Sequence, residues 1–214
     1  TTGISNILIG SLAGDALTDA DYNTAVGTFA LTTDTRGSQS TAFGYGALQN
    51  QNFTTPTASL NVGVGMEAGY AITTGSINTI VGGQAADAMT LGTSNVALGF
   101  AALGAEVAGH RNTAIGTYAL FNQNFSTSTN GLNVAVGYEA LTAQNVDAAY
   151  NVALGYRSGT AVTTGVYNTF VGGDSGKAIT EGLENTAIGY QALNTNVDGD
   201  GIVSDEEFTR VKDI

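Results

Sequence analysis

Side chains that carry oxygen recur at short, regular intervals near the C-terminal end of the chain. Counted from residue 196, they stand at the first, third, fifth, ninth and twelfth places: Asn196, Asp198, Asp200, Ser204 and Glu207. Gly201, at the sixth place, allows the backbone to turn sharply. Hard divalent cations such as calcium prefer oxygen ligands, about six to eight of them. The segment therefore predicts calcium binding.

This spacing resembles the twelve-residue calcium loop of EF-hands and dockerin-like modules. The resemblance implies one backbone ligand, the carbonyl oxygen of Ile202, and five side-chain ligands: Asn196, Asp198, Asp200, Ser204 and Glu207. The sequence departs from the usual loop by having Asn at the first place and no entering helix. A short helix from Asp205 to about Lys212 is expected to fold over the preceding structure, so that the ion either caps this end of the rod or fixes a junction between subunits.

The rest of the chain is an internal repeat in which the pattern Asn-x-x-apolar-Gly recurs. Its terminal glycines are Gly10, Gly27, Gly44, Gly65, Gly82, Gly99, Gly116, Gly137, Gly155, Gly172 and Gly189. Most intervals are 17 residues, and the exceptions are 21 residues twice and 18 once. Such a unit is too short for a helix pair but long enough for two short strands and two tight turns.

This period predicts an all-β fold, a parallel β-solenoid or β-roll with about eleven coils of ~17 residues. The repeat domain is expected to span residues 1–193, and residues 194–214 form the calcium loop and the short helix. Successive side chains of each pentapeptide alternate between two faces. The small face, with Asn, Ala and Gly, suits the coil interior, where identical asparagines can form a ladder.

The other face of each pentapeptide carries an apolar stripe along the rod. Its members are Ile9, Val26, Phe43, Val64, Val81, Leu98, Ile115, Val136, Leu154, Val171 and Ile188. Both faces are expected to be buried. If the stripe points out of the coil, a partner should cover it, because an exposed stripe would promote aggregation.

The nonapeptide Asn-Thr-Ala-Val-Gly-x-x-Ala-Leu at residues 23–31, together with its copies, resembles the head repeats of trimeric autotransporter adhesins and related repeats of bacteriophage tail fibres. The resemblance covers roughly residues 1–193. It implies a left-handed parallel β-roll, packing of three chains around an axis, and adhesion rather than turnover of a substrate. The unit here is longer than the adhesin repeat, so a single-chain solenoid is the alternative to the trimer.

Two four-residue insertions lie at matching places, within loops 49–60 and 121–132. Each brings an amide pair next to an aromatic ring: Gln51, Asn52 and Phe53 in the first, and Gln123, Asn124 and Phe125 in the second. They should project from the same side, and such groups on a rigid scaffold could bind a carbohydrate or a receptor. The alternative is that both are tolerated surface loops whose Phe packs against the coil.

Composition excludes several classes of function. The net charge of −12, with only six Lys and Arg, argues against nucleic acid and anionic membranes as partners. No apolar run is long enough to insert into a membrane, and the absence of Cys leaves the redox compartment open. The chain starts in the middle of a repeat. This start suggests either a fragment of a longer chain or a processed subunit on which another subunit stacks head to tail.

No catalytic constellation is recognisable. His110 is the single histidine and is expected in a turn, so a histidine-based triad has no second candidate. The enzymatic alternative that stays open is a pair of carboxylates brought together from different coils. An ice-binding solenoid is disfavoured, because the Thr residues do not keep the same position from one coil to the next. We therefore expect no enzyme, but an extracellular, homo-oligomeric fibre or filament subunit at a cell surface or on a virion, or an adhesin module.

Overall fold

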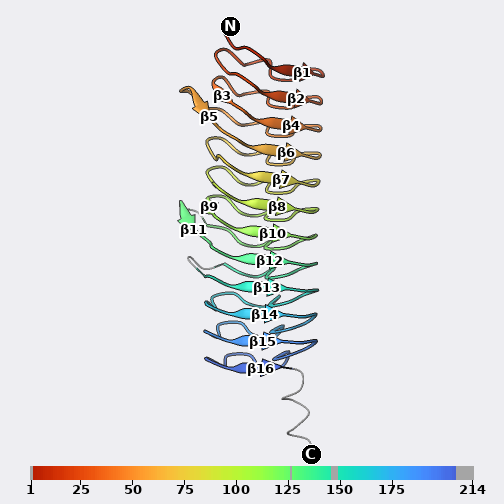
Figure 1. Ribbon diagram of the computed structural model, residues 1–214, viewed down its shortest axis with the longest axis vertical. Coiled ribbons are helices and arrows are strands. Elements are labelled where there is room, and N and C mark those ends of the chain that lie inside the picture. Colours follow the sequence, from red (N-terminus) through yellow and green to blue (C-terminus); the bar gives the residue numbers. More distant parts are fainter. Residues whose placement is uncertain (1, 126, 146–148, 206–214) are drawn as a thin grey trace, which may run out of the picture.

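The chain folds into an elongated parallel β-solenoid, which confirms the fold predicted from the repeat (Figure 1). The computed structural model describes residues 2–125, 127–145 and 149–205. These residues form strands and turns and contain no helix. The helix predicted from Asp205 to about Lys212 lies, beyond its first residue, outside the described part of the chain.

One sheet runs the length of the rod. Its twelve parallel strands, in spatial and chain order, are β1 (Ile7–Ile9), β2 (Thr24–Val26), β4 (Thr41–Phe43), β6 (Val62–Val64), β7 (Thr79–Val81), β8 (Val96–Leu98), β10 (Thr113–Ile115), β12 (Val134–Val136), β13 (Val152–Leu154), β14 (Thr169–Val171), β15 (Thr186–Ile188) and β16 (Val203–Asp205). Each strand pairs with the equivalent strand of the next coil. The last of them, β16, lies within the segment that the sequence assigns to the calcium loop.

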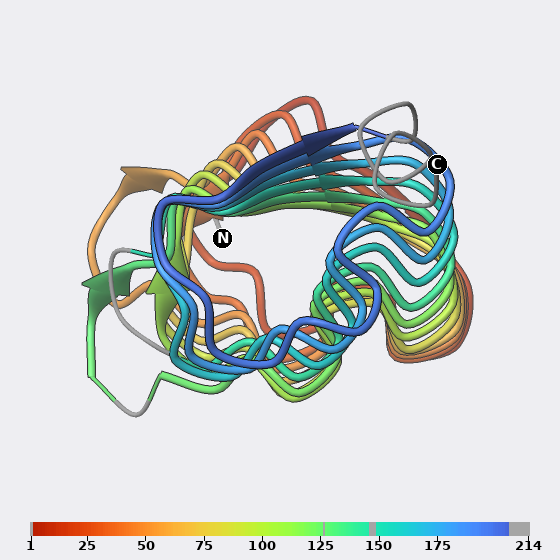
Figure 2. The same cartoon turned by 90° about the horizontal axis from the view of Figure 1, so that it is seen from below.

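The two insertions form two small sheets beside this column. β3 (Gly37–Ser38) pairs with β5 (Thr57–Ala58), and β9 (Gly109–His110) pairs with β11 (Thr129–Asn130). Seen along the rod, both lobes project from the same side, as the matching positions of the insertions predict (Figure 2). His110 therefore lies in a short strand rather than in a turn.

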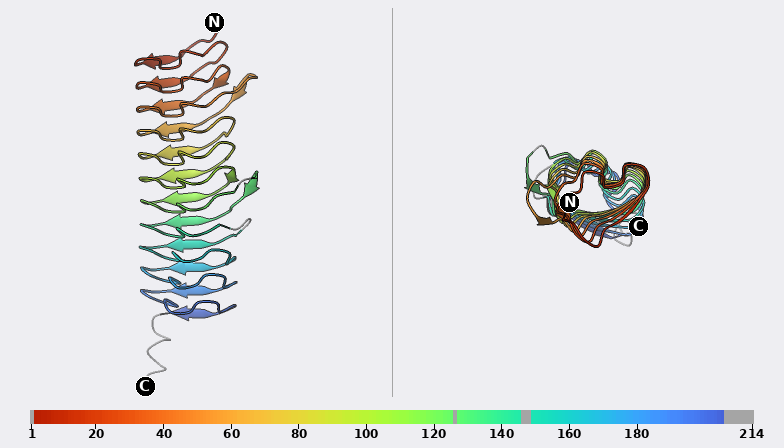
Figure 3. Two further views of the ribbon diagram at one scale, coloured as in Figure 1. Left: turned by 180° about the vertical axis from the view of Figure 1, so that it is seen from behind. Right: turned by 90° about the horizontal axis from the view of Figure 1, so that it is seen from above.

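Most coils contain one strand, not the two that the repeat length suggested. The second half of each coil is interrupted by residues in the left-handed conformation, such as Phe29 (φ 61°) and Leu31 (φ 53°). A left-handed residue breaks the extended backbone that a strand needs. The turns are nevertheless bonded from coil to coil, since the Leu31 N–H donates to the Ala47 carbonyl at 3.0 Å. The strands and the turns therefore stack in separate columns (Figure 3).

The interior of the coil is filled by the inward face of each strand, which is mostly alanine but carries Ile80 in β7 and Phe170 in β14, and by apolar side chains of the turns. Ala25, Ala97 and Ala153 are fully buried, and so are the asparagines that precede the strands. The predicted asparagine ladder is confirmed. The Asn95 N–H donates to Asn78 Oδ1 at 3.0 Å, and Asn78 Nδ2 donates to the Gly92 carbonyl at 2.8 Å. These two amides thus join neighbouring coils and satisfy buried backbone groups, whereas Asn112 Nδ2 in the same ladder has no hydrogen-bond partner among the described residues.

A glycine ends each strand of the repeat because the coils approach closely there. Gly82 has φ 138°, and a Cβ atom at this position would overlap the carbonyl oxygen of Gly99 in the next coil. Gly99 meets Gly116 in the same way. Only glycine combines this backbone conformation with this contact. The column of glycines explains why the repeat tolerates no side chain at that position.

Candidate functional site

The apolar stripe faces outward and is open to solvent in the single chain. Phe43 is 55% exposed and Leu98 is 43% exposed, whereas the alanines beside them in the same strands are fully buried. In-register pairing places every stripe residue next to its equivalent in the neighbouring coil, for example Val81 beside Leu98. The expectation that both faces are buried is therefore wrong for the single chain, because the coil is narrow and only its small face points inward.

The side chains predicted to bind a ligand are mostly buried. Gln51 and Gln123 are fully buried, and Phe53 and Phe125 are 7% and 4% exposed. These four side chains do not reach the surface, which weighs against the predicted contact with a ligand. Asn52 and Asn124 are exposed, and neither has the predicted aromatic neighbour at the surface.

Buried carboxylates explain why the insertion residues turn inward. Glu106 Oε1 accepts hydrogen bonds from the backbone N–H groups of Ala108 at 2.9 Å and Gly109 at 2.6 Å, and Glu106 Oε2 accepts one from Gln123 at 2.7 Å. The Phe125 N–H also donates to Glu106 Oε1, at 3.2 Å. Glu106 thus anchors the second insertion from the preceding coil.

Asp34 anchors the first insertion in the same way. Its Oδ1 accepts from the N–H of Gly37 at 2.9 Å and from the N–H of Phe53 at 3.1 Å. Its Oδ2 accepts from Gln51 Nε2 at 2.5 Å. Asp34 and Glu106 are both fully buried. Sequence reasoning missed both anchors, although each stands 17 residues before the Gln that it binds.

The predicted calcium ligands from Asn196 to Ser204 lie in a further coil of the solenoid. Asn196 Oδ1 accepts from the Gly199 N–H at 2.8 Å, which repeats the contact between Asp34 and Gly37. The Ile202 N–H donates to Asn185 Oδ1 at 2.9 Å, so Ile202 continues the backbone of the asparagine ladder. Each of these residues occupies a regular position of the coil.

The two aspartates of this segment bond to the preceding coil. Asp198 Oδ1 accepts from Thr180 Oγ1 at 2.9 Å, and Asp200 Oδ1 accepts from the Leu183 N–H at 2.9 Å. Asp19 and Asp21 accept equivalent bonds near the other end, from Thr2 Oγ1 at 2.6 Å and from the Ile4 N–H at 2.8 Å. The Asp-x-Asp pairs at both ends therefore link neighbouring coils.

The calcium segment keeps the turn geometry of a regular coil. Gly201 has φ 63°, which suits the predicted sharp turn, but Tyr167 and Glu184 have φ 59° and 57° at the equivalent places of the two preceding coils. Asn196 and Ser204 line one pocket at the end of the coil, whereas Asp198 and Asp200 are exposed. Within residues 2–125, 127–145 and 149–205, no three acidic or histidine side chains gather around one point. Glu207, the predicted bidentate ligand, lies outside the described residues.

A row of aromatic rings follows the strand-ending glycines and was not foreseen from the sequence. We call Phe100, Tyr118, Tyr138 and Tyr156 the aromatic ladder, because they belong to four successive coils. Neighbouring ring centroids lie 5.6, 6.4 and 5.5 Å apart along the ladder. The signal was available for Phe100, Tyr138 and Tyr156, each of which directly follows a repeated glycine, whereas Tyr118 stands one place later, after Thr117.

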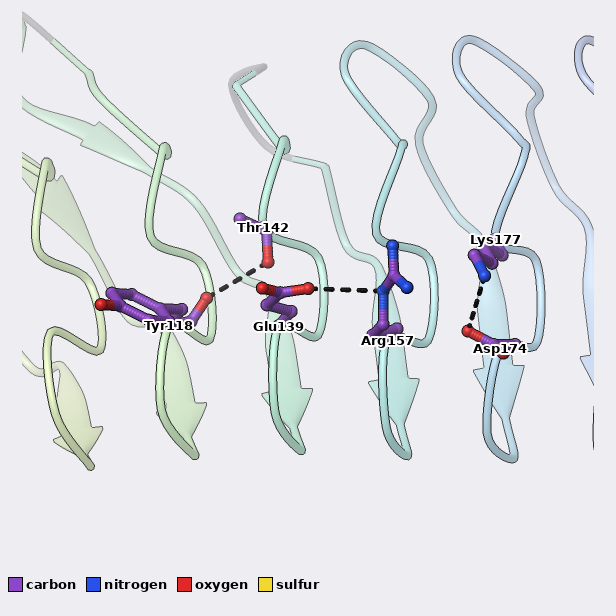
Figure 4. A network of polar contacts seen from close by, with 6 residues as sticks. All are labelled: Tyr118, Glu139, Thr142, Arg157, Asp174 and Lys177. Atoms are coloured by element: carbon purple, nitrogen blue, oxygen red, sulfur yellow. Dashed lines mark hydrogen bonds and ion pairs between the residues drawn. The ribbon is translucent and has the colours of Figure 1, made fainter.

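Charged side chains lie alongside the ladder (Figure 4). Glu139 forms an ion pair with Arg157 at 3.3 Å, and Asp174 forms one with Lys177 at 3.2 Å. A hydrogen bond with Glu139, and then the negative charge of Glu139, raise the pKa of Tyr138. On the same flank of the rod, burial raises the pKa of Asp87, and nearby Glu67 adds to the effect.

His110 stabilises the second lobe rather than a reactive site. Its Nδ1 accepts from the Thr93 N–H at 2.9 Å, and its Nε2 lies 2.6 Å from Ser128 Oγ. Burial lowers the pKa of His110, the positive charge of Arg111 lowers it further, and Glu106 opposes both. The ring thus serves in its neutral form as a hydrogen-bond acceptor between coils.

Comparison with known proteins adds no identification. No protein-family model, curated protein or solved structure matches the chain. Among the described residues there is also no helix of the length and apolar character that a membrane crossing requires.

Proposed function

We propose that this chain is a rigid segment of an extracellular fibre and that its copies associate through the apolar stripe. The outward position of the stripe carries the proposal. Phe43, Leu98 and Leu154 are 55%, 43% and 37% exposed within one continuous apolar surface. Contiguous apolar surfaces of this kind mark association sites in soluble proteins.

A second copy of the chain is the best match for this surface. Stripe residues recur once per coil, about every 4.8 Å along the rod. A copy aligned along the same axis presents the same repeat, so its side chains interdigitate over the whole length. Three copies around an axis, as the adhesin-like repeats imply, would bury all three stripes. A filament of copies joined end to end is the alternative assembly.

The fold suits a spacer that must resist bending. The twelve-stranded sheet and the column of turns are bonded in every coil, and the asparagine ladder adds links in the interior. Coils that contact only their neighbours build a rod whose length is set by the repeat number. Such a rod at a cell surface or on a virion would hold other domains at a fixed distance.

Calcium stabilisation of the C-terminal end belongs to the same proposal. Asn196, Asp198, Asp200, Ser204 and Glu207 offer oxygen atoms at the spacing of a calcium loop, with Ile202 as the backbone ligand. The coil hydrogen bonds of Asp198 and Asp200 compete with the ion for their oxygen atoms. Calcium would therefore bind more weakly here than in a paired EF-hand.

Binding of a carbohydrate or receptor through loops 49–60 and 121–132 is less well supported. Four of the six side chains that would form the ligand surface are buried: Gln51, Phe53, Gln123 and Phe125. The structural role is favoured because the stripe runs over eleven successive coils, whereas only one of the three predicted ligand side chains of each loop is exposed.

Negative-stain electron microscopy of the purified chain, in calcium and in a chelator, tests the proposal. We expect rods in which several chains lie side by side, thicker than one coil stack. Long filaments that shorten in the chelator would assign calcium to the contact between ends. Separate thin rods of one chain at micromolar concentration, in both solutions, would rule out self-association.

A further inference from the structure

We propose that the aromatic ladder binds an uncharged polysaccharide strand that lies along the rod, with about one sugar ring per coil. The ladder comprises Phe100, Tyr118, Tyr138 and Tyr156. The ladder borders the apolar stripe, since Tyr138 stands two residues after Val136, and its proposed ligand goes beyond the structural role proposed above. Three features indicate the kind of ligand: the exposed surface of the rings, the spacing of the rings along the rod, and the charged side chains beside them.

Three of the four rings of the ladder are exposed to solvent, and Tyr118 is half-buried. Phe100, Tyr138 and Tyr156 are 44%, 42% and 54% exposed. The rings of Tyr138 and Tyr156 are nearly parallel, at 11°, with centroids 5.5 Å apart. Parallel rings in contact lie only about 3.5–4.0 Å apart, so these two rings must be displaced sideways, and part of each face stays uncovered.

The spacing of the rings along the rod is similar to the spacing of sugar rings in a linked chain. In a β-1,4-linked chain of glucose or N-acetylglucosamine, both faces of each pyranose ring carry C–H groups and the hydroxyl groups form the rim, and the length of the ring is similar to the coil step of about 4.8 Å. Aromatic side chains stack on such C–H faces, while the tyrosine hydroxyls bond to the rim. A strand parallel to the rod can therefore meet the Tyr138 and Tyr156 rings in the same way, whereas the Tyr118 ring stands edge-on to Phe100 and Tyr138, at 85° and 78°.

The neighbouring side chains supply what the hydroxyl groups of a sugar need. The Glu139–Arg157 pair stands beside Tyr138 and Tyr156, and the Arg157 guanidinium carbon lies 6.0 Å from the Tyr156 ring centroid. The pair offers acceptors and donors at fixed positions, with side chains 30% and 35% exposed. The overall charge of −12 repels acidic polysaccharides, so an uncharged one is favoured.

The ladder and the stripe lie on opposite sides of the strand-ending glycine in the sequence of each coil. Tyr138 follows Gly137, and the stripe residue Val136 precedes it. Association of chains through the stripe and binding of a sugar strand on the ladder can therefore be removed by different substitutions. Failure of one proposal leaves the other standing.

Tyrosine fluorescence provides the assay, because the chain contains no Trp. Uncharged β-1,4-linked glucose and N-acetylglucosamine oligomers of two to six units are titrated into the full chain. Affinity should rise with oligomer length and level off at about four units, the span of four coils at about 4.8 Å each. The double variant Tyr138→Ala/Tyr156→Ala should bind at least about tenfold more weakly, from the loss of two stacking contacts.

Tyr150 and Tyr167 give a matched control. They are also a stacked pair, 5.5 Å apart at 18°, and are 48% and 55% exposed, but they lie before their strands rather than after them. Tyr150→Ala/Tyr167→Ala should leave binding unchanged. The proposal is overturned if no oligomer binds saturably, or if both double variants lose affinity equally. It is also overturned if Tyr138→Ala/Tyr156→Ala changes the number of associated chains, which would assign the ladder to a second copy.

Discussion

The side-chain amide of Gln123 donates to the carboxylate of Glu106 across 2.7 Å, and both residues are fully buried. The same amide accepts from Asn133 through its oxygen, at 3.0 Å. Gln123 therefore ties the buried acid of one coil to the asparagine ladder of another. This chain of contacts fixes the second insertion against the rod.

Glu106→Gln should destabilise the fold by about 1–3 kcal/mol, since it leaves a buried polar group unpaired. The amide introduced by this substitution would point its NH₂ group either at the backbone N–H groups that the Glu106 carboxylate now accepts from, or at the NH₂ group of Gln123. Rotation of Gln123 cannot repair the clash, because it would break the bond from Asn133. Chemical denaturation measures the loss, and Glu181→Gln at an exposed position is the control. Equal stability of the two variants would show that Glu106 does not anchor the insertion.

Gly82→Ala should be far more disruptive than Gly83→Ala. An added Cβ at Gly82 would overlap the Gly99 carbonyl oxygen, in a backbone conformation with φ 138°. At Gly83 the nearest atom to an added Cβ is Phe100 Cδ2, at 3.6 Å. We expect Gly82→Ala to lower the melting temperature strongly or to prevent folding, with a small change for Gly83→Ala. Similar melting temperatures would contradict the close packing of the glycine column.

His110 should make the fold more sensitive to acid. Its folded pKa is lowered from 6.5, so the unfolded chain binds the proton more readily. Its stabilising contribution is complete above pH 6.5 and declines as the pH falls from there towards the lowered pKa. His110→Asn keeps an acceptor for the Thr93 N–H but cannot titrate in this range. Melting curves between pH 7.5 and 5 should show a larger loss for the original chain, and parallel curves would contradict the prediction.

Calcium binding should depend on the C-terminal Asp-x-Asp pair and not on the N-terminal one. Isothermal titration should show one calcium ion per chain, and this binding should be lost in Asp198→Asn/Asp200→Asn. Asp19→Asn/Asp21→Asn removes the same charge from equivalent coil positions and should bind calcium normally. Binding of calcium to the folded chain should also raise its melting temperature. No saturable binding, or equal losses in the two variants, would remove calcium from the proposed function.

The regular part of the fold could be predicted because its information is local and repeated. Alternation of small and large residues, such as Ala97 and Leu98, separates the inner from the outer face of a strand. The left-handed conformation of Phe29 and Leu31 has no comparable signal, since neither residue type favours it. The number of strands per coil was therefore overestimated.

The candidate site was less predictable because it depends on contacts between coils. Gln51 turns inward because Asp34, in the preceding coil, binds it. A reading of the insertion alone suggests an exposed ligand loop. Asn196 occupies the same coil position as Asp34, so aligning the C-terminal segment with the 17-residue repeat would have revealed the further coil.

Association through the stripe is tested by sedimentation equilibrium of the chain and of two variants with equal added charge. Leu98→Lys/Val136→Lys places two charges on the stripe, and Thr55→Lys/Thr127→Lys places two on the exposed insertions. We predict that the original chain and the insertion variant sediment as the same oligomer and that the stripe variant sediments as a folded monomer. A monomeric original chain, or an unchanged oligomer of the stripe variant, would contradict assembly through this surface.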